Sequence, residues 1–169
     1  MAVVPIRIAP DPVLRQRSKR VRIVDTSIHT LIKDMIETMH DALGVGLAAP
    51  QIGIPLRVIV IAVPEEEEIA LINPEIVRRR GERRVDEGCL SVPGYMGQLK
   101  RSESVTVKGR DRNGKEIRIK AVEMLAQALE HEIDHINGVL YLDRLDSMDD
   151  LRKVEPKETE EPEDAGKEL

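Results

Sequence analysis

Hydrophobic positions in the first third of the chain repeat with the period of a helix. They are spaced i, i+3, i+4, i+7, i+8 and i+11, and they are Ile28, Leu31, Ile32, Met35, Ile36 and Met39. All of them fall on one face of a helix. Thr26 or Ser27 can cap its start, and Gly44 and Gly46 are suited to ending it. The pattern predicts an amphipathic helix between these signals.

Two later segments have the composition of strands. LRVIVIAV (56–63) and IALINPEIV (69–77) are rich in β-branched residues, and the glutamates between them predict a solvated loop. Segment 101–122 predicts a hairpin, because valines and then isoleucines alternate with polar residues on either side of Asn113-Gly114. That dipeptide is typical of tight turns that need positive φ.

A second helix is predicted from near Ala121 to Asn137-Gly138, where the glycine is a suitable stop. The chain shows no internal repeat. Strands joined mostly by short turns, with one early and one late helix, favour an α+β fold. We therefore expect antiparallel or mixed sheets around the late helix.

Composition limits the size and location of the protein. The chain has 169 residues and lacks Phe and Trp, so its single core must be aliphatic. Residues 1–150 form the expected domain. From Asp149 to Leu169 there are nine acidic and four basic residues, a net charge of −5 that equals that of the whole chain. We expect residues 151–169 to be a disordered acidic tail.

The sequence also indicates a compartment. No apolar run approaches the roughly 20 residues of a membrane span. The first residues, MAVVPIRIAPDPVL, do not resemble a secretory signal. Cys89 is the single cysteine, which excludes an internal disulfide. We expect a soluble protein of the bacterial cytoplasm that acts neither on DNA nor at a membrane.

The stretch LEHEIDHINGVL (129–140) places two histidines and a glutamate close together on the second predicted helix. His131 and His135 lie about 40° apart on the helical wheel, one turn from each other. They share a face with Met124 and Ala128, whereas Glu130 falls on the expected solvent side. In an H-E-x-x-H pattern both imidazoles can reach one metal ion and the glutamate, here Glu132, can act as a general base. The alternative is a partly exposed histidine pair without a task.

A catalytic metal ion usually needs a third protein ligand. Cys89, in VDEGCLSVPG, is the one thiol that the chain offers. A lone cysteine is often an inert core residue, and that alternative stays open from the residues alone. The charged Asp86 and Glu87 nearby favour a thiolate ligand instead.

GVGLAAPQIG (44–53) is the third unusual stretch. Its glycines allow backbone to approach a ligand closely, and Gln51 can donate its amide N–H to a developing oxyanion. The alternative is a helix stop followed by a turn.

GVGLAAPQ, EGCLS and HEIDH, in this order and at these separations, resemble the peptide deformylases. The resemblance covers residues from about 3 to 148. It implies a hydrolase that removes the formyl group from the N-terminal methionine of newly made bacterial proteins. The implied cofactor is one divalent ion, with Fe²⁺ expected and Zn²⁺, Ni²⁺ or Co²⁺ as substitutes.

The same resemblance implies roles for individual residues. Cys89, His131 and His135 are the implied metal ligands, and Glu132 is the implied general base and later acid. Gln51 and the backbone N–H of Leu90 are the implied oxyanion donors. The implied substrate contacts are the backbone of Gly46, which aligns the formyl end, and an apolar methionine pocket of Val45, Met124 and Ala128. Glu87 and Asp134 would fix the ligands and their neighbours, with Arg101 as the partner of Asp134.

Two alternatives to this function remain from the sequence. One is a different metal-dependent amidohydrolase or aminopeptidase on the same scaffold. The other is a metal-holding or ribosome-bound module without turnover, because RRRGERR (78–84), with Lys100 and Arg101, could contact ribosomal RNA. A solvated turn with balancing acids explains the basic stretch equally.

Two positions depart from the family's usual pattern. The residue before the first histidine is often Gln and is Glu130 here, where its solvent-facing position predicts little effect. Many relatives carry an Arg after SVPGY that helps to hold the substrate backbone, and this chain has Met96.

We therefore predict that Met96→Arg lowers KM for formyl-methionyl peptides, because the guanidinium adds a donor to the substrate backbone. Steady-state kinetics of the two proteins checks this. An unchanged or higher KM contradicts it.

Overall fold

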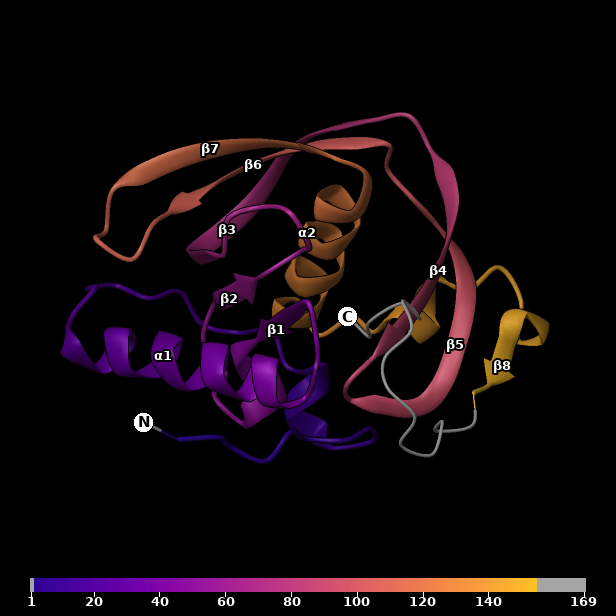
Figure 1. Ribbon diagram of the computed structural model, residues 1–169, viewed down its shortest axis with the longest axis horizontal. Helices are drawn as coiled ribbons and strands as arrows, with labels where there is room; N and C mark the ends of the chain where they lie inside the picture. Colours follow the sequence, from indigo (N-terminus) through magenta and orange to yellow (C-terminus); the bar gives the residue numbers. More distant parts are fainter. Residues whose placement is uncertain (1, 155–169) are drawn as a thin grey trace.

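The computed structural model describes residues 2–154 (Figure 1). Its helices and strands are α1 (Thr26–Asp41), β1 (Gly46–Ala48), β2 (Val58–Ile61), β3 (Ile69–Arg80), β4 (Arg83–Cys89), β5 (Val92–Arg101), β6 (Ser104–Arg110), β7 (Glu116–Val122), α2 (Glu123–Ile136) and β8 (Leu151–Lys153). They form a five-stranded sheet, β1-β2-β3-β6-β7, and a three-stranded sheet, β4-β5-β8, with antiparallel pairing throughout. The predicted α+β class is confirmed.

The N-cap of α1 lies earlier in the sequence than predicted. Asp25, rather than Thr26 or Ser27, is the N-cap, and its carboxylate accepts from the N–H groups of Ser27 (3.0 Å) and Ile28 (3.3 Å). The helix also ends before the predicted glycines. Its last residue is Asp41, and the N–H of Gly44 then closes the end by donating to the carbonyl of Met39 (3.0 Å).

β2 is buried on both faces, which explains its uninterrupted apolar sequence. Val58 and Val60 pack in one core cluster with the apolar stripe of α1, including Met35 and Met39. Ile59 and Ile61 belong to a second cluster on the opposite side of the sheet, where α2 contributes Leu129, Ile133 and Ile136. The two helices therefore cover opposite faces of the five-stranded sheet.

The β6–β7 hairpin is confirmed, with a different turn from the one predicted. Its loop spans residues 111–115, and Gly114 alone takes a positive φ there, of 81°. Asn113 does not take the positive φ that was predicted for it, and the loop is instead held by Asp111. Its carboxylate accepts from the N–H groups of Asn113 (2.9 Å) and Lys115 (3.0 Å).

The three-stranded sheet was not predicted. β4 and β5 form a long hairpin closed by the turn at Leu90 and Ser91, and β8 pairs with β5 at Tyr95–Gly97. β8 starts one residue after the predicted boundary at 150, so the sheet continues into the first residues of the predicted tail. The rest of that tail, residues 155–169, lies outside the described residues.

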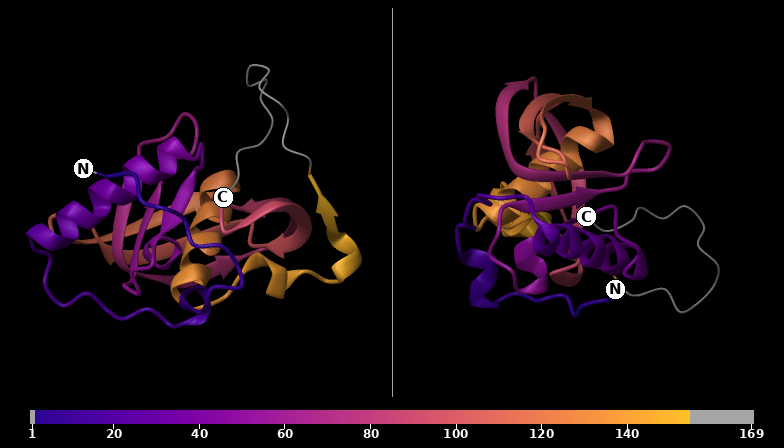
Figure 2. Two further views of the ribbon diagram at one scale, coloured as in Figure 1. Left: turned by 90° about the horizontal axis from the view of Figure 1, so that it is seen from below. Right: turned by 90° about the vertical axis from the view of Figure 1, so that its left-hand side faces the viewer.

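α2 lies between the five-stranded sheet and the β4–β5 hairpin (Figure 2). It ends at Ile136, just before the predicted Asn137-Gly138 stop. Gly138 has φ 77°, and a Cβ there would lie 2.6 Å from the carbonyl oxygen of Arg15, so the turn requires glycine. Within residues 2–154, no helix has the length and apolarity to cross a bilayer.

We predict that Met35→Ala lowers the free energy of unfolding by about 2–5 kcal/mol, because it leaves a cavity in a core cluster that contains only aliphatic side chains and methionine. Met35 has 0% exposure, and Met148, at 67%, provides the matched control. Met148→Ala should change stability by less than about 0.5 kcal/mol. Urea unfolding measures both, and equal effects would contradict the assignment of Met35 to the core.

Candidate metal centre and active site

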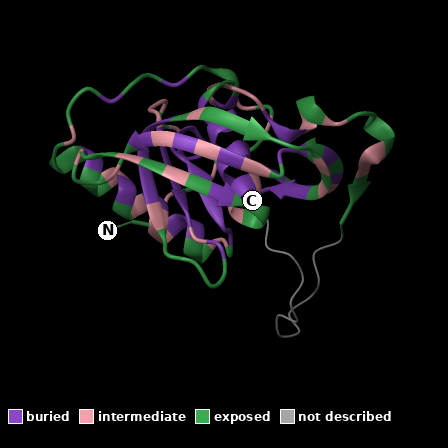
Figure 3. Cartoon of the chain, turned by 90° about the horizontal axis from the view of Figure 1, so that it is seen from above, coloured by how far each residue is buried: buried purple, intermediate pink, exposed green. Residues whose placement is uncertain are grey.

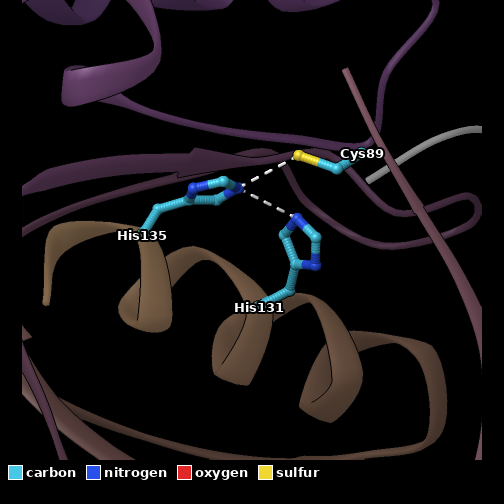
Figure 4. A group of neighbouring side chains, drawn as sticks. All are labelled: Cys89, His131 and His135. Carbon is cyan, nitrogen blue, oxygen red and sulfur yellow. Dashed lines mark hydrogen bonds between the residues drawn. The ribbon is translucent and has the colours of Figure 1, made fainter. Parts of the chain in front are cut away.

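Three potential ligands converge where the end of β4 meets α2. His131 and His135 project from successive turns of α2 toward Cys89, the last residue of β4 (Figure 4). The Nε2 atom of His135 lies 3.2 Å from Cys89 Sγ and 3.1 Å from His131 Nε2. The three ligand atoms lie within 4.8 Å of one another, and all three residues are buried. The prediction that these residues come together is confirmed.

The donor set suits a divalent cation. Two imidazole nitrogens and one sulfur face a common point, and their lone pairs repel one another unless a proton or cation lies between them. One thiolate and two imidazoles are ligands for iron, zinc, nickel and cobalt. The residues present therefore fit the metal ion that the sequence implied.

The electrostatic environment attracts positive charge to this point. Burial acts to lower the pKa of His131, but the nearby Glu132 and Glu87 carboxylates outweigh it and raise the pKa well above its usual value. Burial and the adjacent His131 instead hold the pKa of His135 well below its usual value. Of the two imidazoles, His131 is therefore the one that favours a positive charge.

A buried chain of charges fixes the ligands. Glu87 accepts from Arg101 (2.7 and 2.8 Å) and also contacts His131 Nδ1. Arg101 donates as well to Asp134 on α2 (2.8 Å), so the expected Arg101–Asp134 contact is present. Burial acts to raise the pKa of Glu87, but hydrogen bonding to Arg101 and the charge of His131 lower it to about 2. Glu87 is therefore a permanent carboxylate that orients His131.

Glu132 has the opposite environment. It is fully buried, and neither carboxylate oxygen has a hydrogen-bond partner among the described residues. Burial raises its pKa to about 7, against the opposing charge of His131. Gly46, at the start of β1, lies against this carboxylate so closely that a Cβ at Gly46 would collide with Glu132 Oε2. The structure therefore places Gly46 directly beside Glu132.

The predicted oxyanion donors lie on the other side of the cysteine. The side-chain oxygen of Gln51 accepts from the N–H of Ala48 (2.9 Å), which directs its Nε2 toward Cys89 Sγ (3.6 Å) and Ser91 Oγ (3.1 Å). Leu90 follows Cys89 directly in the β4–β5 turn. Both predicted donors therefore lie next to the ligand cluster.

Two of the three residues of the predicted methionine pocket lie together in the core. Val45 and Ala128 belong to the same buried cluster. Met124 lies in the first turn of α2 and is 46% exposed. Their role toward a substrate side chain stays a prediction.

The structure corrects the position of Glu130. We expected it on the solvent side of α2, but it is 7% exposed. Its carboxylate accepts from the N–H (2.7 Å) and hydroxyl (3.2 Å) of Ser102, and Arg79 lies 3.4 Å away. The helical wheel gave its direction correctly, but it did not reveal that the corner between β5 and β6 covers that direction.

The basic surface predicted from RRRGERR, Lys100 and Arg101 is not one surface. Arg101 is 3% exposed and neutralised by Glu87 and Asp134. Arg79 pairs with Glu130, and Arg84 pairs with Asp146 and Asp150. The cations of this stretch therefore point in different directions. Arg79, Arg84 and Arg101 have acidic partners, whereas Arg78 and Arg80 have none among the described residues.

Sequence reasoning also missed three neighbours of the site. Ser91 orients Gln51, Arg144 donates to Asp134 (2.8 Å), and the ring of Tyr141 stacks on His131 at 6.4 Å and 25°. Arg144 and Tyr141 belong to the 3-10 turn Tyr141–Arg144, outside any periodic pattern. The proximity of Ser91 to Cys89 in the sequence is the one signal that could have identified any of them.

Known proteins share this sequence and this arrangement. The family model described as polypeptide deformylase matches residues 3–151. A peptide deformylase of Dehalococcoides mccartyi (strain CBDB1) is 54% identical over 157 residues, which are 92% of this chain and 94% of the relative. One of Thermomicrobium roseum is 46% identical, with 98% of each chain covered.

Solved structures agree with the sequence comparison. The crystal structure of a peptide deformylase from Legionella pneumophila has a TM-score of 0.84 and 50% identity, covering 87% of this chain and 88% of that one. The peptide deformylase from Ehrlichia chaffeensis in complex with actinonin has a TM-score of 0.86 and 42% identity, covering 88% and 92%. These matches cover most of this chain and most of each matched chain, so the chain belongs to the polypeptide deformylase family.

Proposed function

We propose that this chain hydrolyses the N-terminal formyl group from formyl-methionyl nascent polypeptides and releases formate, in the bacterial cytoplasm. One observation carries the proposal beyond family membership. A buried glutamate whose carboxylate has no protein partner, Glu132, lies beside three converging ligands. An unpartnered buried carboxylate is costly, and its placement there is explained by proton transfer.

Cys89, His131 and His135 would hold one divalent ion, with Fe²⁺ expected and Zn²⁺, Ni²⁺ or Co²⁺ as substitutes. The ion would supply Lewis acidity and would lower the pKa of a bound water toward neutrality. Glu87 keeps His131 oriented, because a ligating imidazole is fixed by the partner of its other nitrogen.

Glu132 moves the proton in this scheme. A general acid–base group works best with a pKa near the working pH, and burial raises the pKa of Glu132 to about 7. As a carboxylate it accepts the proton of the attacking water. As a carboxylic acid it then protonates the leaving amine, so the same proton is taken and returned.

The surrounding backbone selects the substrate. The amide of Gln51 and the N–H of Leu90 would donate to the oxygen that becomes negatively charged in the tetrahedral transition state. Gly46 would align the formyl end, where the contact with Glu132 leaves no space even for a Cβ. An acetyl group is larger by one methyl, so we expect it to be excluded sterically. Val45, Met124 and Ala128 would line an apolar pocket for the methionine side chain of the substrate.

A formate-release assay tests the proposal directly. Formyl-methionyl, acetyl-methionyl and unblocked peptides of the same sequence are compared, and we expect turnover of the first alone. Cleavage of the unblocked peptide would instead indicate an aminopeptidase, and cleavage of both blocked peptides a less selective amidohydrolase.

We predict that Glu132→Gln lowers kcat by roughly 10²- to 10⁴-fold, because the amide cannot accept a proton. The metal content should be unchanged, as measured by elemental analysis of the same preparation. Glu130→Gln is the matched control, because Glu130 is a buried carboxylate two residues away that bonds Ser102 rather than the site. Similar losses of kcat in both variants would contradict the assignment of Glu132.

Removal of the metal gives an independent prediction. Chelation should abolish turnover and also lower the midpoint of thermal unfolding, because an ion that binds only the folded state stabilises it. Adding back Fe²⁺ without oxygen should restore both. Cys89→Ala should prevent the restoration. Full activity of protein that is free of metal by elemental analysis would exclude the proposed role of the three ligands.

A further inference from the structure

Among residues 2–154, no helix covers half of one face of the five-stranded sheet. α1 packs against β1 and β2, and α2 covers the opposite face. Val58 pairs with Ile72 and Ile72 with Arg110, so Arg110 lies on the same face as the residues beneath α1. Beyond β2 this face continues over the end of β3, β6 and β7. Buried and half-buried residues alternate along β6, and half-buried and exposed residues alternate along most of β7 (Figure 3).

The uncovered part of this face is basic. Its cross-strand rows are Arg80–Ser104–Val122, Arg78–Thr106–Lys120, Glu75–Lys108–Arg118 and Arg110–Glu116. We call the six cations among them the basic face: Arg78, Arg80, Lys108, Arg110, Arg118 and Lys120. The rows contain two carboxylates, so the surface is positive although the chain has a net charge of −5.

Most of these cations have no acidic partner. Among the described residues, the one ion pair on the basic face joins Lys108 and Glu116 (2.8 Å). Arg78, Arg80 and Lys120 surround a hollow of about 300 Å³ that also presents the hydroxyls of Ser104 and Thr106. Guanidinium, ammonium and hydroxyl donors without an acceptor form a suitable site for phosphate oxygens.

The positive surface continues toward the N-terminal segment. Arg20 lines a hollow of about 270 Å³ together with Lys108 and Arg110 of the basic face. A run of cations that is longer than a single phosphate is suited to an extended polyanion.

We propose that the basic face binds the phosphate backbone of structured RNA. The choice of RNA rests on the proposed function, because nascent polypeptides emerge from a particle built largely of RNA. The strand spacing of about 4.8 Å and the spacing of about 6.8 Å between alternate residues distribute the cations over a plane, which suits a helical backbone better than one isolated phosphate. Val122 is the single apolar residue in the rows, so the face lacks the apolar anchors of membrane-binding surfaces.

The test compares two double variants of the full chain with equal loss of charge. Arg78→Gln/Lys120→Gln alters the basic face, and Lys33→Gln/Lys100→Gln removes exposed cations on α1 and β5. Binding to a labelled RNA duplex of about 16 base pairs is measured by anisotropy across a range of salt concentrations. Turnover of a short formyl-methionyl peptide is measured on the same proteins.

We expect the unaltered chain to bind RNA with an affinity that falls linearly with salt on logarithmic axes. Arg78→Gln/Lys120→Gln should reduce the slope by about two and the affinity by at least about tenfold, while peptide turnover stays unchanged. The control pair should retain both the slope and the affinity. Peptide turnover tests the proposed function separately. A chain that turns over the peptide but does not bind RNA would therefore contradict only the RNA proposal.

Three outcomes overturn the inference. Equal weakening by both double variants would show that net charge, rather than this face, determines binding. Absence of RNA binding by the unaltered chain at low salt would exclude RNA as the partner. Stronger binding to vesicles of anionic lipid or to polyglutamate than to the RNA duplex would assign the face to a different occupant.

Discussion

The site depends on one buried guanidinium. Arg101, at the end of β5, bonds Glu87 on β4 and Asp134 on α2, and it is 3% exposed. These contacts attach the three-stranded sheet to the helix of the other sheet, which is what brings Cys89 to the two histidines. Without Arg101, Glu87 would be buried with only His131 as a charged partner, and removal of one member of a buried ion pair costs several kcal/mol in comparable sites. The metal ligands are therefore held by a charge network rather than by a single element.

The same network gives different pKa values to two carboxylates near His131. Glu87 has Arg101 beside it, which keeps its pKa at about 2 despite burial. Glu132 is equally buried but has no cation of its own, so its pKa rises to about 7. Environment alone distinguishes a permanent carboxylate from a proton carrier. The proposed division of roles follows from which of the two glutamates Arg101 can reach.

Local patterns predicted the parts of the molecule in which neighbours in sequence are neighbours in space. The stripe of α1, the β6–β7 hairpin and the His131–Glu132–His135 turn are of this kind. β4 and β5 were not predicted, because charged residues and glycines occupy positions where alternation would be expected. Glu130 was misplaced for a related reason. A helical wheel gives the direction of a side chain, whereas burial depends on which distant segment covers that direction.

The position of the charged side chains also depends on how the strands are arranged in space. The cations of RRRGERR are adjacent in sequence yet diverge in space. Arg78 and Arg80 join the basic face with cations of β6 and β7, whereas Arg79 and Arg84 pair with carboxylates elsewhere. Alternation along β6 explains how this face and the site coexist. Val105 and Val107 are buried in the cluster with α2, and the intervening Thr106 and Lys108 therefore point away from it. One strand thus supports the catalytic helix on one side and carries positive charge on the other, so substitutions on the basic face can leave the site undisturbed.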